Sequence, residues 1–128
     1  MKKNVIIILL LFYIIFNTMT KEIIKLPEPN YDSNTSIEKS LLKRRSIREY
    51  KNSPLSLKDV SQLLWACQGI TKNGFYRTAP SAGALYPLEI YLIAGNVNKI
   101  NPGIYKYNPL NHQLINIIDN PRFSQYQC

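Results

Sequence analysis

Cysteine and histidine are scarce in this chain of 128 residues, which contains two cysteines and one histidine. Cys67 and Cys128 lie too far apart for a Cys-x-x-Cys pair, and two cysteines are too few for a disulfide scaffold, so we predict no metal site. Cys67 falls on the apolar stripe of an expected helix. A buried, inert thiol is favoured there over a nucleophile, since His112 is the only histidine that could activate it.

Acidic residues are also few, with 8 Asp and Glu against 16 Lys and Arg, which gives a net charge of +8. Such an excess can indicate a nucleic-acid binder. Here the densest basic cluster, residues 43–48, is a single segment without interleaved aromatic residues, and no zinc-finger or RNP-like pattern occurs. We therefore predict no nucleic-acid partner and place most of the excess lysines on a solvated surface.

A long membrane-spanning run is missing as well. Residues 5–16 form an apolar run of 12 residues behind Lys2 and Lys3, whereas a membrane span needs ~20 apolar residues. A basic start before a short apolar core is typical of a secretory signal, but residues 17–20 are no Ala-x-Ala cleavage site, so an uncleaved hydrophobic anchor helix is an open alternative. We expect residues 1–20 to be a signal-like or membrane-anchor segment and residues 5–16 to contact the membrane. The protein would then be membrane-associated or exported, with a cytoplasmic location as the alternative.

The rest of the chain is predicted to be one α+β domain, residues 35–128, preceded by a linker at 21–34 that contains Pro27 and Pro29. The capping-box spacing of Thr35 and Glu38 predicts a short helix from about 36 to 43 or 44. A second helix is expected at 57–68, with Ser56 as its N-cap and Gly69 after its end.

Three strands are expected beyond a loop at 71–87 that has room for one helical turn. The nearly continuous apolar run 88–94 is typical of a central strand covered on both faces. The strands 103–107 and 112–118 are separated by a short Asn- and Pro-containing turn, which predicts an antiparallel hairpin.

One segment combines three arginines with a serine, namely Arg44, Arg45, Ser46 and Arg48. Guanidinium groups pair bidentately with phosphate oxygens, so such a segment can hold a phosphorylated cofactor. Part of the basic character could also be helix-end chemistry, because the helix dipole favours cations at the C-terminus.

A second segment is small and bounded by prolines, running from Pro80 through Ser81, Ala82 and Gly83 to Pro87. Small residues let backbone N–H groups approach a ligand closely. For Ser81, a turn-stabilising hydroxyl and a direct ligand contact are equally acceptable interpretations.

Together with residues 24–27, 63–71 and 103–109, these segments resemble the nitroreductase-like flavoenzymes, and within them the SagB-type dehydrogenases related to thiazole- and oxazole-forming peptide oxidases. The resemblance implies an FMN-dependent α+β fold that usually dimerises with the cofactor at the subunit interface. Ala84 stands where many nitroreductases carry an amide, a departure shared by the SagB-type branch. The chain is short for this family, so we expect only the first half of the fold.

By this resemblance the FMN-binding residues are Arg44, Arg45, Ser46, Arg48, Pro80, Ser81, Ala82 and Gly83, and we expect the two segments to converge on one flavin. The implied reaction is hydride transfer through FMN with a small-molecule or peptide substrate and an NAD(P)H donor, in a homodimer if the full domain is present. Lys72, Tyr76 and Tyr86 could serve as proton-transfer groups, but the sequence assigns this role to none of them. The alternative function is a catalytically incompetent fragment that acts as a membrane-tethered interaction module.

Overall fold

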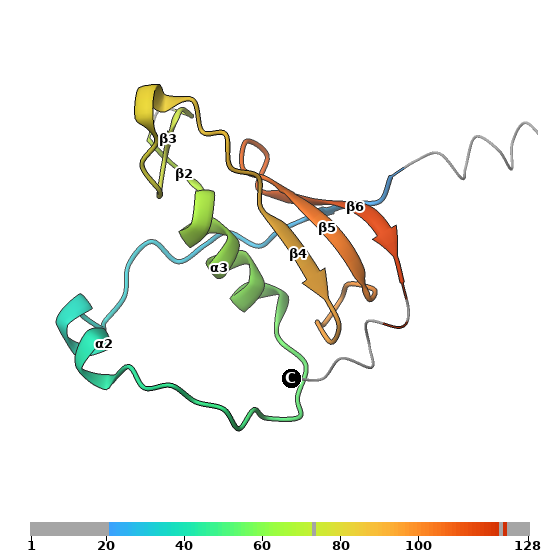
Figure 1. Cartoon of the computed structure of the whole chain (residues 1–128), viewed down its shortest axis with the longest axis horizontal. Helices are drawn as coiled ribbons and strands as arrows, with labels where there is room; N and C mark the ends of the chain where they lie inside the picture. The colour runs from blue at the N-terminus through green and yellow to red at the C-terminus, as the bar shows by residue number, and fades with distance from the viewer. Residues whose placement is uncertain (1–20, 73, 121, 123–128) are drawn as a thin grey trace, which may run out of the picture.

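Figure 1 shows the chain as a computed structural model, and the structure describes residues 21–72, 74–120 and 122. The expectations for residues 1–20, a hydrophobic helix with signal-like or anchoring character and membrane contact through 5–16, lie outside these residues. Within the described ranges, no helix has the length and apolar character that a membrane crossing requires.

A four-stranded antiparallel sheet forms the centre of the fold. Its strands are β1 (Ile23–Lys25), β4 (Tyr91–Ala94), β5 (Gly103–Asn108) and β6 (Gln113–Asp119), in the spatial order β1-β6-β5-β4. Strands β5 and β6 form the predicted antiparallel hairpin. The turn between them ends at His112, whose backbone is left-handed with φ of 46°.

Two sequence predictions about the sheet were wrong. The segment expected to be a linker contains β1, and Leu26 directly after it is 3% exposed and donates its N–H to the His112 carbonyl at 3.1 Å. The prolines that indicated a linker follow the strand instead of interrupting it. Strand β4 was predicted to be central and covered on both faces, but it is an edge strand in which Ile93 is 67% exposed.

Helix α3 (Leu57–Gln68) has the predicted bounds and covers one face of the sheet. Ser56 caps it by accepting a hydrogen bond from the Asp59 N–H at 3.1 Å. The buried side chains of this layer, which form the core, are Leu26, Val60, Leu64, Ala94, Tyr105, Tyr107 and Leu114. Because α3 meets the sheet along the side that carries Val60 and Leu64, Cys67 is exposed, and the prediction that its thiol is buried was wrong.

Gly69 ends α3, as the sequence indicates, for a reason of space. Its backbone is extended, with φ of −65° and ψ of 155°. A Cβ at this position would lie 2.1 Å from Trp65 Cδ1, which is far inside van der Waals contact. Glycine is therefore needed so that the chain can leave the helix past the indole ring.

Helix α2 (Ile37–Lys43) forms where a helix was predicted, but it packs against nothing in the described chain. Its N-cap is Ser36, not Thr35, and the Ser36 Oγ accepts from the Lys39 N–H at 3.2 Å. No residue of α2 is buried, and Ile37 and Leu42 are each 75% exposed. The helix and the extended segment after it therefore project from the body of the molecule (Figure 1).

The predicted loop at 71–87 is more ordered than expected. It contains the two-stranded hairpin β2 (Ile70–Lys72) and β3 (Tyr76–Arg77), which the sequence did not reveal because both strands are very short. The expected helical turn is present as the 3-10 turn η1 (Ala82–Ala84).

Candidate functional site

The arginine segment starts at the C-terminal end of α2, and its residues are exposed. Arg44 is the C-cap residue, and its N–H donates to the Ser40 carbonyl at 2.9 Å. The Arg45 guanidinium donates to the Leu42 and Arg44 carbonyls at 2.9 and 2.7 Å. Arg45 therefore performs the helix-end role that the sequence left open, because a cation there stabilises the orphan carbonyls of the last turn.

Arg44, Ser46 and Arg48 remain available for a ligand. In the described part of the chain the ion pair found is the one between Lys106 and Glu89, so these arginines have no carboxylate partner there. Two guanidinium groups on an extended, exposed segment can accept a phosphate without first breaking an internal contact. Such a donor set is suited to a phosphate group.

The second segment is a strained turn. Gly83 has φ of 59°, and Ala84 and Tyr86 follow with φ of 52° and 46°. Left-handed backbone is uncommon for residues other than glycine, and it concentrates where a loop is shaped for function. Around a Cβ built at Gly83, only Leu85 Cγ comes near, at 3.8 Å, so the tip of the turn is open to a ligand.

Ser81 stabilises the turn, which is one of the two roles that its sequence position allows. Its Oγ accepts a hydrogen bond from the Tyr86 N–H at 2.9 Å and so closes the turn. Pro80, Ala82 and Gly83 are exposed around it. A ligand contact from Ser81 would come in addition to this hydrogen bond.

The chain by itself does not bring the two segments together. Figure 1 places α2 and the arginine segment at one end of the molecule, and η1 with the β2–β3 hairpin at the other. The expectation that both converge on one flavin is therefore not met within a single chain. The binding roles of the individual residues remain predictions.

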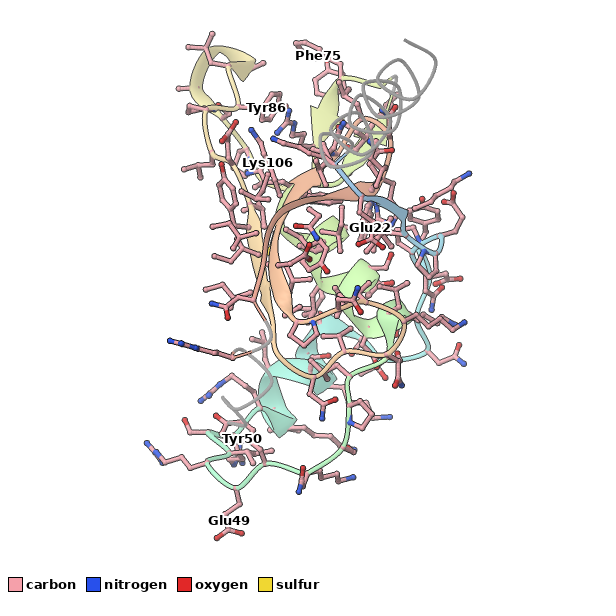
Figure 2. The ribbon with its side chains drawn as sticks, turned by 90° about the vertical axis from the view of Figure 1, so that its right-hand side faces the viewer. Glu22, Glu49, Tyr50, Phe75, Tyr86 and Lys106 are labelled. Carbon is pink, nitrogen blue, oxygen red and sulfur yellow. The ribbon has the colours of Figure 1, made fainter. Side chains whose placement is uncertain are left out.

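Sequence reasoning missed a groove of about 500 Å³ beside the second segment. Three cations, Lys21, Arg77 and Lys106, line it together with Tyr86 and Glu89. Figure 2 shows two of these side chains, Tyr86 and Lys106, in the upper part of the molecule. With one carboxylate against three cations, the groove favours an anionic occupant. The sequence gives little sign of it, because its lining comes from separate strands and loops.

Arg77 connects this groove to the second segment. Its guanidinium carbon lies 4.7 Å from the centre of the Tyr86 ring, and its Nη1 donates to Gln68 Oε1 at 3.3 Å. Stacking on one side and a hydrogen bond on the other hold the turn against the end of α3. Arg77 lies three residues before the small segment 80–83 and Tyr86 three residues after it, and this proximity in sequence is the signal that could have identified them.

The ion pair between Lys106 and Glu89 in the groove shifts the pKa values of both side chains. The hydrogen bond from Lys106 is the main cause that lowers the pKa of Glu89, and the same bond raises the pKa of Lys106. Both groups are therefore held in their charged forms, and neither is poised for proton transfer near neutral pH.

The geometry does not support a proton-transfer role for Lys72, Tyr76 or Tyr86. Lys72 and Tyr76 are exposed on the β2–β3 hairpin, and the Tyr86 ring is stacked with Arg77. Tyr107 lies deeper, and burial raises its pKa to about 12, which removes it as a general base. Among the described residues, no group of three or more His, Cys, Asp and Glu side chains could hold a metal ion.

Comparison with known proteins gives one family. A family model described as the nitroreductase family matches residues 41–127. A protein of Methanocaldococcus jannaschii, provisionally named a nitroreductase, is 47% identical over 83 residues, which are 65% of this chain and 42% of that protein.

A solved structure agrees with this match. The crystal structure of a protein from Ralstonia eutropha, also provisionally named a nitroreductase, superimposes with a TM-score of 0.62 at 36% identity. It covers 73% of this chain, and this chain covers 42% of it. The chain thus spans less than half the length of both relatives, and it has their α+β fold in part.

Proposed function

Because the chain belongs to the nitroreductase family, we propose that it is part of an FMN-dependent oxidoreductase that transfers hydride between a donor and a substrate. When bound, the flavin supplies the redox chemistry, and the protein binds and orients it. The observation that carries the proposal is the pair of unengaged guanidinium groups, Arg44 and Arg48, within the region that the family model matches. They would hold the phosphate.

We further propose that the site forms between two copies of the chain. The arginine segment and the η1 turn lie at opposite ends of one molecule (Figure 1), so a second copy is the simplest way to place both beside one flavin. Directly before the arginines, the α2 side chains Ile37, Leu41 and Leu42 are 75%, 68% and 75% exposed. These apolar side chains would form part of such an interface. One copy would contribute Arg44, Ser46 and Arg48, and its partner the turn at 80–83.

The SagB-type branch is the finer part of the proposal. It is supported by Ala84 in place of the amide that many nitroreductases carry, and it implies a small-molecule or peptide substrate and an NAD(P)H donor. The alternative, a fragment without catalytic competence that is tethered to a membrane, predicts no flavin binding.

The test is a titration of the full chain with FMN, followed by quenching of the flavin fluorescence. We expect saturable binding that the double substitution Arg44→Ala and Arg48→Ala weakens at least tenfold, since two charge-assisted contacts are lost. Lys51→Ala is the matched control, because Lys51 is an exposed cation on the same extended segment. Absence of binding by the unmodified chain would favour the fragment alternative, and an equal loss in the control would refute the assigned site.

A further inference from the structure

The turn after Pro80 has left-handed backbone at residues that normally avoid this conformation. Gly83 has φ of 59°, and the non-glycine residues Ala84 and Tyr86 have φ of 52° and 46°. A residue with a Cβ is disfavoured there, because the Cβ comes too close to the following carbonyl oxygen. Such a turn keeps its shape only where its surroundings hold it.

The hydrogen bonds inside the turn close it but do not attach it to another element. The Ala84 N–H donates to the Ser81 carbonyl at 3.1 Å, and the Leu85 N–H donates to the Ala82 carbonyl at 3.4 Å. The Tyr86 N–H donates to the Ser81 Oγ at 2.9 Å. All three acceptors belong to the turn itself, so the attachment has to come from a side chain.

Tyr86 provides this attachment through its ring. The guanidinium carbon of Arg77 lies 4.7 Å from the ring centre, and the Phe75 ring meets it edge to face at 6.2 Å. Arg77 Nη1 in turn donates to Gln68 Oε1 at 3.3 Å, and Gln68 is 4% exposed at the end of α3. The buried amide orients the guanidinium, and the flat guanidinium orients the ring of Tyr86.

The hairpin that carries Arg77 is also fixed to α3. The Thr78 N–H donates to the Gly69 carbonyl at 3.0 Å, and the Thr78 Oγ1 donates to the Trp65 carbonyl at 3.0 Å. Direct contacts therefore run from the last turn of α3 through Arg77 and Tyr86 to the strained turn.

We propose that Arg77 is a positioning residue, which holds Tyr86 and thereby the left-handed backbone at 83–86 in the shape that the flavin meets. Arg77 acts through Tyr86 and not by contact with the ligand. The consequence for FMN rests on the proposed function, whereas the effect on the turn does not.

Hydrogen exchange of the full chain without FMN tests the positioning itself. In Arg77→Ala, the amides of residues 84–86 should exchange at least tenfold faster, while the core amides of β5 and β6 keep their rates. Arg77→Lys should behave like Arg77→Ala, because lysine keeps the charge but lacks the flat fork. Lys72→Ala is the matched control and should leave the turn unchanged, since Lys72 is an exposed cation on the same hairpin.

A glycine at position 84 gives a readout that a general loss of stability would not change. Glycine adopts φ of 52° without the steric cost that alanine has. Adding Ala84→Gly to Arg77→Ala should therefore slow the exchange of the Tyr86 amide again, to within about threefold of the unmodified chain. In an FMN titration, Arg77→Ala should weaken binding at least fivefold, and the added glycine should restore most of the affinity.

Four results would overturn the positioning role: unchanged exchange at 84–86 in Arg77→Ala, full retention of the turn in Arg77→Lys, no recovery with the glycine, or unaltered FMN affinity despite faster exchange. Faster exchange in Arg77→Ala, in a chain whose unmodified form does not bind FMN, contradicts the proposed oxidoreductase only. FMN binding by the unmodified chain, with unchanged exchange in Arg77→Ala, contradicts only the positioning role.

Discussion

At the scale of single residues, a buried polar network joins three parts of the chain that are distant in sequence. His112 Nε2 lies 2.7 Å from Ser61 Oγ and 3.0 Å from the Pro27 carbonyl, and its Nδ1 lies 2.9 Å from the Tyr107 hydroxyl. Ser61 also donates to the Pro27 carbonyl. Because that carbonyl can only accept, the network assigns the proton to Nε2 and makes Nδ1 the acceptor from Tyr107.

The network has a structural and not a catalytic role. A serine next to a histidine can indicate a nucleophile, but Ser61 is 0% exposed and its hydroxyl proton is committed to Pro27. The hydrogen bonds tie the β5–β6 turn to α3 and to the segment after β1. Sequence reasoning could not find this cluster, because Ser61 and His112 are 51 positions apart and nothing local indicates their contact.

Tyr107→Phe tests the network, because it removes one hydroxyl and keeps the ring. We expect a loss of about 1–3 kcal/mol in the free energy of unfolding, since His112 Nδ1 would lose its donor at a partly buried position. Urea unfolding measures the loss. Tyr91→Phe is the control: its hydroxyl donates to Glu89 at 2.9 Å but is exposed, so a change within about 0.5 kcal/mol is expected. Equal effects of the two substitutions would argue against a buried network.

At the scale of elements, the two helices differ in what holds them. Helix α3 contributes Val60 and Leu64 to the core, whereas α2 has no buried residue. Both begin with a serine cap of the same geometry, Ser36 and Ser56. Ser56 was predicted as the cap of α3, whereas the sequence indicated Thr35 in place of Ser36 at α2. The packing was not predicted, because an apolar stripe such as that of α2 shows only that a partner is needed.

Substitution of the two cap residues, Ser36 and Ser56, tests whether α2 and α3 differ in their contribution to stability. Ser56→Ala should lower the free energy of unfolding by about 1 kcal/mol, because α3 unfolds with the core. Ser36→Ala should leave the global unfolding transition unchanged and accelerate amide exchange within 37–43 only, since α2 can unravel alone. Thermal unfolding and hydrogen exchange measure the two effects. A comparable loss of global stability from Ser36→Ala would show that α2 is packed after all.

Local pattern therefore predicted the elements that are defined locally. The bounds of α3 and the β5–β6 hairpin follow from caps, periodicity and turn residues. Strand β1 was not predicted, because a strand of three residues beside two prolines shows little hydrophobic periodicity. The edge position of β4 was not predicted, because strand order depends on contacts between residues far apart in sequence. The exposure of Cys67 was not predicted for the same reason, since tertiary packing determines which face of α3 is buried against the sheet.

At the scale of the whole molecule, the chain has three apolar surfaces that its described residues do not cover. These are the outer side of the sheet at Ile23, Ile93 and Ile118, the apolar side of α2 (Ile37, Leu41 and Leu42) and the side of α3 that carries Leu63. A domain normally buries such faces within one core. The chain spans 42% of each of the two relatives, and under the proposed function a second copy would cover the apolar side of α2.

Sequence resemblance identified the two segments proposed to bind FMN, but not their separation in space. The arginines and the small-residue turn were recognised by residue type, which carries no information on distance. Figure 1 shows that they lie at opposite ends of one chain, which is why we propose that two copies complete each other's sites.

The most direct measurement mixes two variants that each lack one half of the site. The first carries Arg44→Ala and Arg48→Ala, and the second carries Ala82→Glu, an exposed position where a carboxylate would repel the phosphorylated ligand. Neither should bind FMN alone. After mixing at equal amounts and exchange of subunits, half of the dimers are mixed and each has one intact site, so about a quarter of the unmodified FMN capacity should return. No recovery above the separate variants, once exchange of labelled subunits is demonstrated, would contradict a shared site.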